Sequence, residues 1–211
     1  MKDSHRKQQA GDGISVQRAS WSFSGDVSKT FNEHIRSSIP LYDEGHDLTC
    51  RLSDFFVQEN STCYEFGTST GTLIKKLADR HAHKPDVRWI GVDTVPEMLA
   101  KANDSQNRVE FVLGDVIDFD IEKCDLVLSY YLIQFIPPRF RQDVLTRIYQ
   151  ALNWGGALIC FEKVRAPDAR FQDYISQIYS EYKSDQGYSA DEIQNKSASL
   201  KSVLEPFSTQ G

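Results

Sequence analysis

A short turn with two glycines, between a strand-like segment and a helical pattern, constrains this fold more than any other feature. Residues 63–72 read Cys-Tyr-Glu-Phe-Gly-Thr-Ser-Thr-Gly-Thr. After the turn, apolar residues recur at helical spacing, at Leu73, Ile74, Leu77 and Ala78. Gly67 and Gly71 allow a ligand to approach the backbone closely, and the first N–H groups of the helix would point at it. Such a turn alone is equally consistent with a tight connection that binds no ligand.

Acidic residues in three successive strand-like segments favour a ligand. Glu65 precedes the turn, Asp93 ends the second segment, and Asp115 follows the third. The carboxyl ends of parallel strands lie at one edge of a sheet, where nucleotides bind. We therefore expect Asp93 to accept hydrogen bonds from ribose hydroxyls and Asp115 to lie at an adenine edge. The expected nucleoside site comprises these acids and their neighbours: Glu65, Gly67, Thr68, Ser69, Gly71, Asp93, Thr94, Asp115 and Val116.

Strands and helices alternate along the rest of the chain. Further strands are predicted at 124–131 and 157–161, with helices at 96–103 and 139–152. Asn153-Trp154-Gly155-Gly156 is predicted to end the second of these helices, because glycine is common just after a helix. The sequence thus predicts an α/β fold: a Rossmann-like, doubly wound, mostly parallel sheet of at least five strands, with its ligand across the strand ends.

Helices are also expected before and after the sheet, and no strand is expected after the last of them. The first of these helices begins near Asp26 or Ser28, the second covers 44–57 and the third covers 171–182. The fourth runs from a cap at Ser189 to about residue 204.

Composition fits one domain without a membrane span. The chain has 211 residues, 40% of them hydrophobic and 26% charged, and no apolar run approaches the ~18 residues of a span. We expect a flexible tail over 1–20, which lacks the apolar run of a secretory signal, and one domain over 21–211. The widely spaced cysteines are expected to be buried free thiols of a cytoplasmic protein: Cys50, Cys63, Cys124 and Cys160.

Charge argues for a small-molecule substrate rather than nucleic acid. The formal net charge is −6, and acidic chains do not bind phosphate backbones by bulk electrostatics. Arg139, Arg141 and Arg147 are expected on a solvated helix face. His81 and His83 have no third metal ligand near them in sequence, so a solvated helix end is expected there and no metal site.

The order Glu65-x-Gly67, Asp93 and Gly114-Asp115 resembles the class I S-adenosylmethionine-dependent methyltransferases. From Trp21 to about Val203 the chain is most similar to the carboxy-S-adenosylmethionine synthases of tRNA wobble-uridine modification. The matching positions are Trp21, Phe23, Phe31, Ile35, Ser38, Pro40, Tyr42, Ile148-Tyr149-Gln150, Leu152-Asn153, Gly155-Gly156-Ala157-Leu158, Glu162-Lys163, Gly187-Tyr188-Ser189 and Glu192-Ile193.

This resemblance implies S-adenosyl-L-methionine as the cofactor. In the synthases, the residues that match Tyr42 and Tyr130 line the cofactor pocket together with Asp93 and Asp115. The synthases also hold the added carboxylate, which comes from a prephenate-type donor, with an arginine whose position here is Ser197. A serine cannot form a bidentate cationic clamp, and the neighbouring Lys196 offers only a point charge.

Three functions stay open on the sequence. The first is a methyltransferase that acts on an unidentified, small-molecule acceptor; the second is a carboxy-S-adenosylmethionine synthase; the third is a non-catalytic, cofactor-binding partner subunit. Tyr130, Tyr131, Glu162 and His46 are candidate pocket residues, although packing is their more usual role, and no catalytic residue is assigned. Methyltransferases of this class usually close the sheet with a reversed hairpin, which is not visible here, so a homodimer or partner protein is expected at the exposed edge.

Overall fold

The computed structural model describes residues 27–102, 106 and 108–208. They form two compact units, one of residues 43–162 and one that combines the segments before residue 43 and after residue 162. We refer to these as the larger and the smaller unit. One domain over 21–211 stays a prediction, and the expected tail over 1–20 lies outside the described residues.

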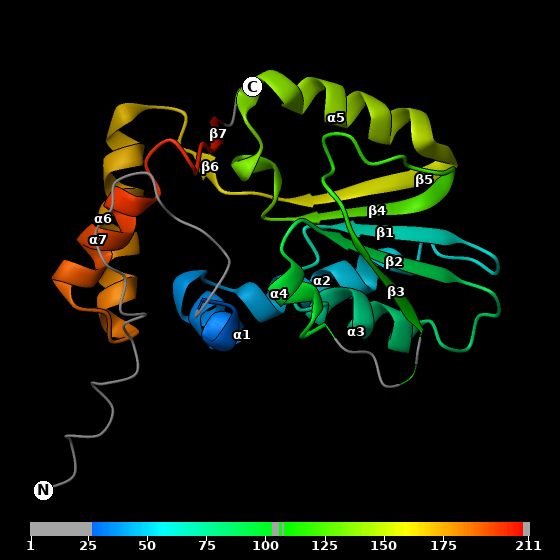
Figure 1. Cartoon of the computed structure of the whole chain (residues 1–211). Helices are drawn as coiled ribbons and strands as arrows, with labels where there is room; N and C mark the ends of the chain where they lie inside the picture. Colours follow the sequence, from blue (N-terminus) through cyan, green and yellow to red (C-terminus); the bar gives the residue numbers. More distant parts are fainter. Residues whose placement is uncertain (1–26, 103–105, 107, 209–211) are drawn as a thin grey trace, which may run out of the picture. The chain divides into compact units, whose positions relative to one another are not determined.

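The larger unit contains a five-stranded parallel sheet in the order β3-β2-β1-β4-β5 (Figure 1). Its strands are β1 (Thr62–Phe66), β2 (Arg88–Asp93), β3 (Val109–Leu113), β4 (Cys124–Tyr130) and β5 (Leu152–Phe161). From the central β1 the chain adds β2 and β3 on one side and then returns to add β4 and β5 on the other. The strand order therefore reverses between β1 and β4, which is the point where open α/β sheets bind ligands.

Helices cover both faces of this sheet, which confirms the predicted Rossmann-like, doubly wound fold (Figure 1). One apolar core lies under α2 (Tyr42–Ser53) and α3 (Thr72–Arg80), and a second lies under α5 (Pro138–Ala151). Alternate residues of β1 enter the two cores: Cys63 enters the first, and Tyr64 and Phe66 the second. Two short elements complete the unit, α4 (Pro96–Leu99) and the 3-10 helix η1 (Ile133–Phe135).

The smaller unit consists of α1 (Val27–Ser38), α6 (Ala169–Asp185), α7 (Ala190–Ser199) and a short parallel pair, β6 (Val164–Arg165) with β7 (Phe207–Ser208). The predicted cap at Ser189 is confirmed, because its hydroxyl accepts from the Glu192 N–H and the Glu192 carboxylate accepts from the Ser189 N–H. Two expectations are wrong here. The last helix ends at Ser199, and a strand, β7, follows it.

The junction of α5 and β5 differs from the prediction. No glycine ends α5; the helix stops at Ala151 and Leu152 already pairs with Cys124 of β4. The pairing register then shifts before Ala157, and Gly155 has φ +84°. The two glycines thus belong to a bulge in the edge strand rather than to a helix end, because a bulge also needs a residue that tolerates positive φ.

Two expectations about exposure are also wrong. His81 is buried: a hydrogen bond of 2.8 Å joins its Nε2 to the Ser53 hydroxyl, and its ring stacks on Trp89. Burial and the nearby Lys84 lower the pKa of His81 to about 4. Conversely, Cys160 is exposed because it lies on the edge strand, while the other three cysteines are buried free thiols. Over the described ranges, no group of three or more His, Cys, Asp or Glu residues could hold a metal.

The arginines of α5 do not share one solvated face. Arg141 is buried and donates to the carbonyls of Ile136 and Gln134, which lie in the segment just before the helix. Arg147 donates to carbonyls of the loop after β3, including that of Val116 at 3.0 Å. These side chains therefore hold loops in place. No helix in the described part of the chain is long and apolar enough to cross a membrane.

Candidate functional site

The turn after β1 is held in an unusual backbone conformation. Gly67 and Gly71 have φ of +71° and +70°, and Ser69 between them has φ +52°, in the left-handed region that non-glycine residues seldom adopt. The Ser69 N–H donates to Asp93 Oδ2 at 2.8 Å, and the Ser69 hydroxyl contacts the Met98 sulfur at 3.4 Å. These bonds fix Ser69 in a position where glycine would be the easier choice.

Close packing leaves no room for a side chain at Gly71. A Cβ there would lie 2.6 Å from the Phe111 ring of β3 and 3.4 Å from Ala102. A Cβ at Gly91 of β2 would likewise lie only 2.9 Å from the Thr68 hydroxyl oxygen. The turn therefore lies directly against β2 and β3, and α3 begins immediately after it at Thr72.

Glu65 lies inside the turn rather than at its surface. Its side chain is only 3% exposed, and Oε2 accepts from the Thr68 hydroxyl at 2.7 Å and from the Ile74 N–H at 3.2 Å. The Ile74 N–H belongs to the first turn of α3, so the carboxyl group ties the strand end to the helix start. Burial raises the pKa of Glu65 to about 8. Direct contact with a cofactor stays a prediction.

Asp93 connects β2 to the turn. Its second oxygen, Oδ1, accepts from the Val95 N–H at 2.9 Å, and burial raises the pKa of the carboxyl group in spite of these donors. A carboxylate offers about four acceptor positions, so two N–H donors leave capacity for ribose hydroxyls. Asp93 therefore lies at the end of β2 beside the turn, and its binding of ribose hydroxyls stays a prediction.

The loop after β3 is tied to β2. The Gly114 N–H donates to the Asp93 carbonyl at 3.0 Å, and the Asp115 carboxylate accepts from the Ile117 N–H at 3.0 Å. Val116 is buried in the second core, and its carbonyl is bound by Arg147. The structure therefore brings the turn, Asp93 and Asp115 together at the ends of three adjacent strands. Thr94, the residue after Asp93, is exposed to solvent.

On the other side of β1, Tyr130 ends β4. In the β1–β4 pairing Phe66 lies beside Ser129, which places Tyr130 next to the turn. Its ring packs edge to face against His46 of α2 with 4.7 Å between the ring centres, and its hydroxyl lies so close to Gly45 that a Cβ there would overlap it. Tyr42, the other aromatic residue expected at the cofactor, belongs to the smaller unit.

Glu162, just after β5, has a positioning role that the sequence did not indicate. Its two carboxylate oxygens accept from the Ile133 N–H at 2.7 Å and the Gln134 N–H at 3.1 Å, at the start of η1. Burial raises the pKa of this carboxyl group. The signal was absent from the sequence because donors and acceptor lie almost thirty residues apart.

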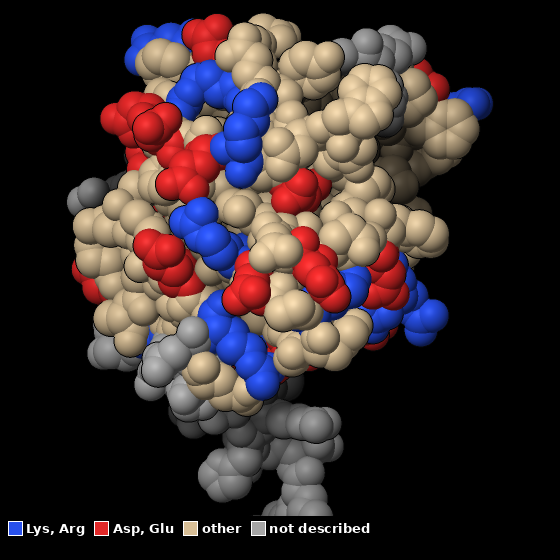
Figure 2. All heavy atoms as spheres, turned by 90° about the vertical axis from the view of Figure 1, so that its right-hand side faces the viewer, with Lys and Arg blue, Asp and Glu red and all other residues tan. Residues whose placement is uncertain are grey.

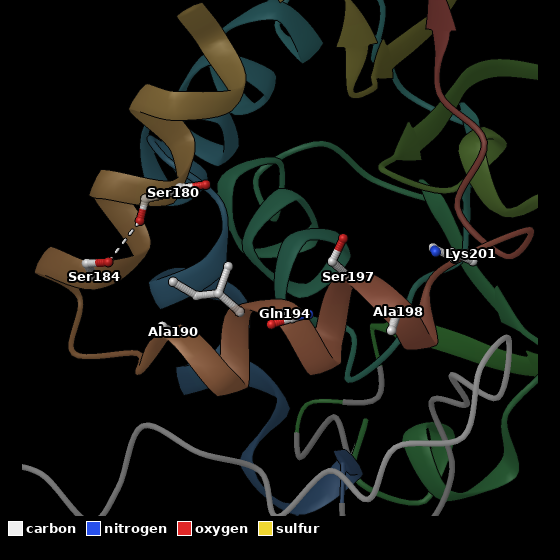
Figure 3. A pocket seen from close by; sticks show the side chains of 8 residues that line it. Ser180, Ser184, Ala190, Gln194, Ser197, Ala198 and Lys201 are labelled. Carbon is white, nitrogen blue, oxygen red and sulfur yellow. Dashed lines mark hydrogen bonds between the residues drawn. The ribbon is translucent and has the colours of Figure 1, made fainter. Parts of the chain in front are cut away.

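The segment that matches the synthase arginine lies on α7 in the smaller unit. Ser197 is exposed and lines a hollow of about 510 Å³ between α6 and α7, with Ser180, Ser184, Gln194 and Lys201 among its neighbours (Figure 3). Lys196 points elsewhere. It is 9% exposed, and its ammonium donates to His34 Nε2 and, at 3.2 Å, to the Ser38 hydroxyl of α1.

The charges seen on one face of the molecule are mixed. In the view of Figure 2, Lys and Arg side chains alternate with Asp and Glu rather than forming one extended basic area. Among the described residues, exposed ion pairs include Arg88 with Glu122 at 2.8 Å and Arg108 with Asp79 at 2.6 Å.

Comparison with known proteins identifies relatives across most of the chain. Residues 64–156 match the model of a family described as "Methyltransferase domain". The carboxy-S-adenosyl-L-methionine synthase of Staphylococcus epidermidis is 32% identical over 190 residues, which cover 89% of this chain and 82% of that protein.

Solved structures share the fold at lower identity. An O-methyltransferase family protein from Burkholderia thailandensis has a TM-score of 0.58 at 20% identity, and the match covers 74% of this chain and 47% of that protein. The DhpI-SAM-HEP complex has a TM-score of 0.51 at 18% identity, with coverage of 70% and 67%. A Haloferax volcanii putative methyltransferase, solved with the Trm112 methyltransferase activator, has 0.50 at 23% identity, with coverage of 82% and 77%.

Proposed function

This chain belongs to the carboxy-S-adenosyl-L-methionine synthase family, but because the position of the synthase arginine is Ser197 here, we propose that it transfers a methyl group from S-adenosylmethionine to a small-molecule acceptor. Its cofactor is S-adenosyl-L-methionine, and it is a class I S-adenosylmethionine-dependent methyltransferase. The acceptor and the transferred group are the parts that we propose.

The residues at the strand ends fit this cofactor. Asp93 would accept from the ribose hydroxyls, the turn from Gly67 to Gly71 would allow close approach of the backbone, and Asp115 would lie at the adenine edge. We further propose that Tyr130 lines the pocket, whereas a role for Tyr42 stays an expectation from the resemblance. The sulfonium of the bound cofactor supplies an activated methyl group.

The chain's own part in methyl transfer is mainly positioning. An in-line displacement is accelerated when donor and acceptor are held at the right distance and angle. A general base is needed only for an acceptor that carries a proton on its reacting atom. Glu162 is committed to the N–H groups of η1, so we assign it to holding the end of β5 rather than to proton transfer.

The observation that favours methyl over carboxyl transfer is that the Lys196 ammonium is bonded within the smaller unit, to His34 and Ser38. Ser197 cannot supply the cationic clamp, and the adjacent ammonium is engaged by His34 and Ser38. Lys201 lines the same hollow as Ser197, but a single amine does not reproduce bidentate binding of a carboxylate.

Carboxyl transfer is the second candidate, and the identity of 32% over 82% of a named synthase favours it. Mass spectrometry of the nucleoside released after incubation with S-adenosylmethionine and prephenate separates the two. We expect unchanged S-adenosylmethionine from the natural protein. A product heavier by one carboxylate would contradict the proposal. We expect the Ser197→Arg protein, which restores the clamp residue, to form that product.

We also propose a homodimer or partner contact at β5. This strand is an edge of the sheet, its bulged part is exposed, and Trp154 within it is fully exposed. The Haloferax volcanii neighbour was solved with a partner protein, which supports a partner on this fold.

Light scattering at high protein concentration tests this contact. We expect a mass above that of one chain for the natural protein and for a Phe55→Lys control, which alters an exposed aromatic residue away from the edge. The Trp154→Lys protein should have the mass of one chain. A natural protein that stays monomeric would rule out the homodimer.

A further inference from the structure

Two lysines of the smaller unit reach the same aromatic ring. The Lys163 Nζ lies 5.1 Å from the centre of the Tyr179 ring, and the Lys183 Nζ lies 4.5 Å from it. Tyr179 and Lys183 are four residues apart on α6 and so share one side of the helix, whereas Lys163 comes from the segment before β6. The Tyr179 hydroxyl donates to the Ser38 carbonyl at 2.8 Å, which holds the ring in place.

The burial of Lys183 is unusual for a lysine. Its residue is only 7% exposed, and buried lysines are normally paired with an acid. Among the described residues, no carboxylate forms an ion pair with it. Burial and repulsion from Lys163 lower the pKa of Lys183 to about 8, and burial also lowers the pKa of Lys163. Contact with the face of an aromatic ring compensates a buried cation only in part.

We infer that Lys163, Lys183 and the Tyr179 ring form a binding site for the phosphate group of a small molecule. Two ammonium groups directed at one ring offer two positive charges, and a phosphate monoester carries nearly two negative charges at neutral pH. Lysine ammonium groups bind phosphate as point charges without requiring a fixed fork geometry. A bound dianion would remove the repulsion between the two lysines and replace part of the hydration that Lys183 lacks.

A small ligand fits this site better than a polymer. The site contains two cations beside one ring, whereas the chain as a whole carries a net charge of −6. A phosphate backbone would meet that unfavourable overall charge, but a single small phosphate would meet only the local pair. The inference goes beyond the proposed methyl transfer and does not depend on the cofactor.

Calorimetric titration of the full chain with inorganic phosphate at constant ionic strength tests the site. We expect saturable binding to the natural protein and a loss of affinity of about tenfold or more in Lys183→Met and in Lys163→Met. Arg170→Met is the matched control, because Arg170 also lies over a ring of α6, that of Phe171, but is exposed. It should bind phosphate as the natural protein does, and Lys183→Arg, which keeps the charge, should retain most of the affinity.

Three results would overturn the inference. They are the absence of saturable binding to the natural protein, equal affinity in the two methionine variants and the Arg170→Met control, and binding of acetate as tight as that of phosphate, which would assign the site to carboxylates. Circular dichroism of each variant shows whether a lost affinity comes from the site or from unfolding. Because S-adenosylmethionine binding is measured separately on the same proteins, failure here is distinguishable from failure of the proposed function.

Discussion

The Glu65 carboxyl group near the end of β1 joins the strand to the turn and to α3, and it can also gain or lose a proton. It accepts hydrogen bonds from Thr68 and Ile74 while almost fully buried. Its folded-state pKa of about 8 lies above the ordinary value of 4.5. The folded protein therefore keeps a proton on Glu65 that the unfolded chain loses between these two values. Stability from this group is fully present below pH 4.5 and is lost as the pH rises toward 8, by up to about 1.4 kcal/mol per pH unit.

Replacement of Glu65 by glutamine should remove this pH dependence. Glutamine keeps an acceptor for the two donors but has no proton to lose. In urea unfolding without cofactor, the Glu65→Gln protein should gain stability relative to the natural protein between pH 5 and pH 8. Glu110→Gln, an exposed acid on β3, is the control and should show no such gain. Identical pH profiles for Glu65→Gln and the natural protein would contradict the burial of an ionisable carboxyl group here.

For individual residues, the sequence predicted the positions of the candidate site residues along the strands but not the contacts that each side chain makes. Glycine spacing and acids at strand ends located the turn, Asp93 and Asp115, because those patterns reflect local backbone needs. The same patterns could not reveal that Glu65 faces inward, since its donors come from the turn and from the first turn of α3. Nor could they separate Lys196 from Ser197, whose directions depend on the packing of α7 against α1.

Among the elements, the strands were easier to predict than the segments that join them. The five strands are short apolar runs, and a parallel sheet buried on both faces produces that signal directly. The start of β5 was missed because Asn153-Trp154-Gly155-Gly156 has the composition of a helix end, while the actual cause of its glycines is a bulge opposite β4. Only the strand pairing distinguishes the two.

Arg141 and Arg147 of α5 illustrate a second reason for such errors. A charged residue on a helix is most simply assigned to solvent, but these guanidinium groups bind loop carbonyls. For Arg147 the acceptors follow β3, far away in the sequence, and they belong to the loop that carries Asp115. The helix that covers the sheet thus also shapes one wall of the candidate site.

For the whole molecule, the proposed cofactor residues at the strand ends and the proposed phosphate site belong to different units. The turn, Asp93, Asp115 and Tyr130 belong to the larger unit, whereas Ser197 and the lysines around Tyr179 belong to the smaller one. The parallel sheet followed from the alternation of strands and helices. The grouping of α1 with α6 and α7 did not, because it rests on contacts between the two ends of the sequence, such as Tyr179 with Ser38.

The central claim is that the turn after β1 binds S-adenosylmethionine, and calorimetric titration of a Gly71→Val variant tests it most directly. A valine at this position meets the Phe111 ring and must adopt a φ near +70° that β-branched residues avoid. Gly155→Ala is the matched control, because Gly155 also has positive φ but a Cβ there would have nothing within 4 Å. We expect S-adenosylmethionine to bind the natural protein and the Gly155→Ala control, and the folded Gly71→Val protein to lose affinity by about a hundredfold or more. Equal affinity in all three proteins, or no binding to the natural protein, would contradict the account.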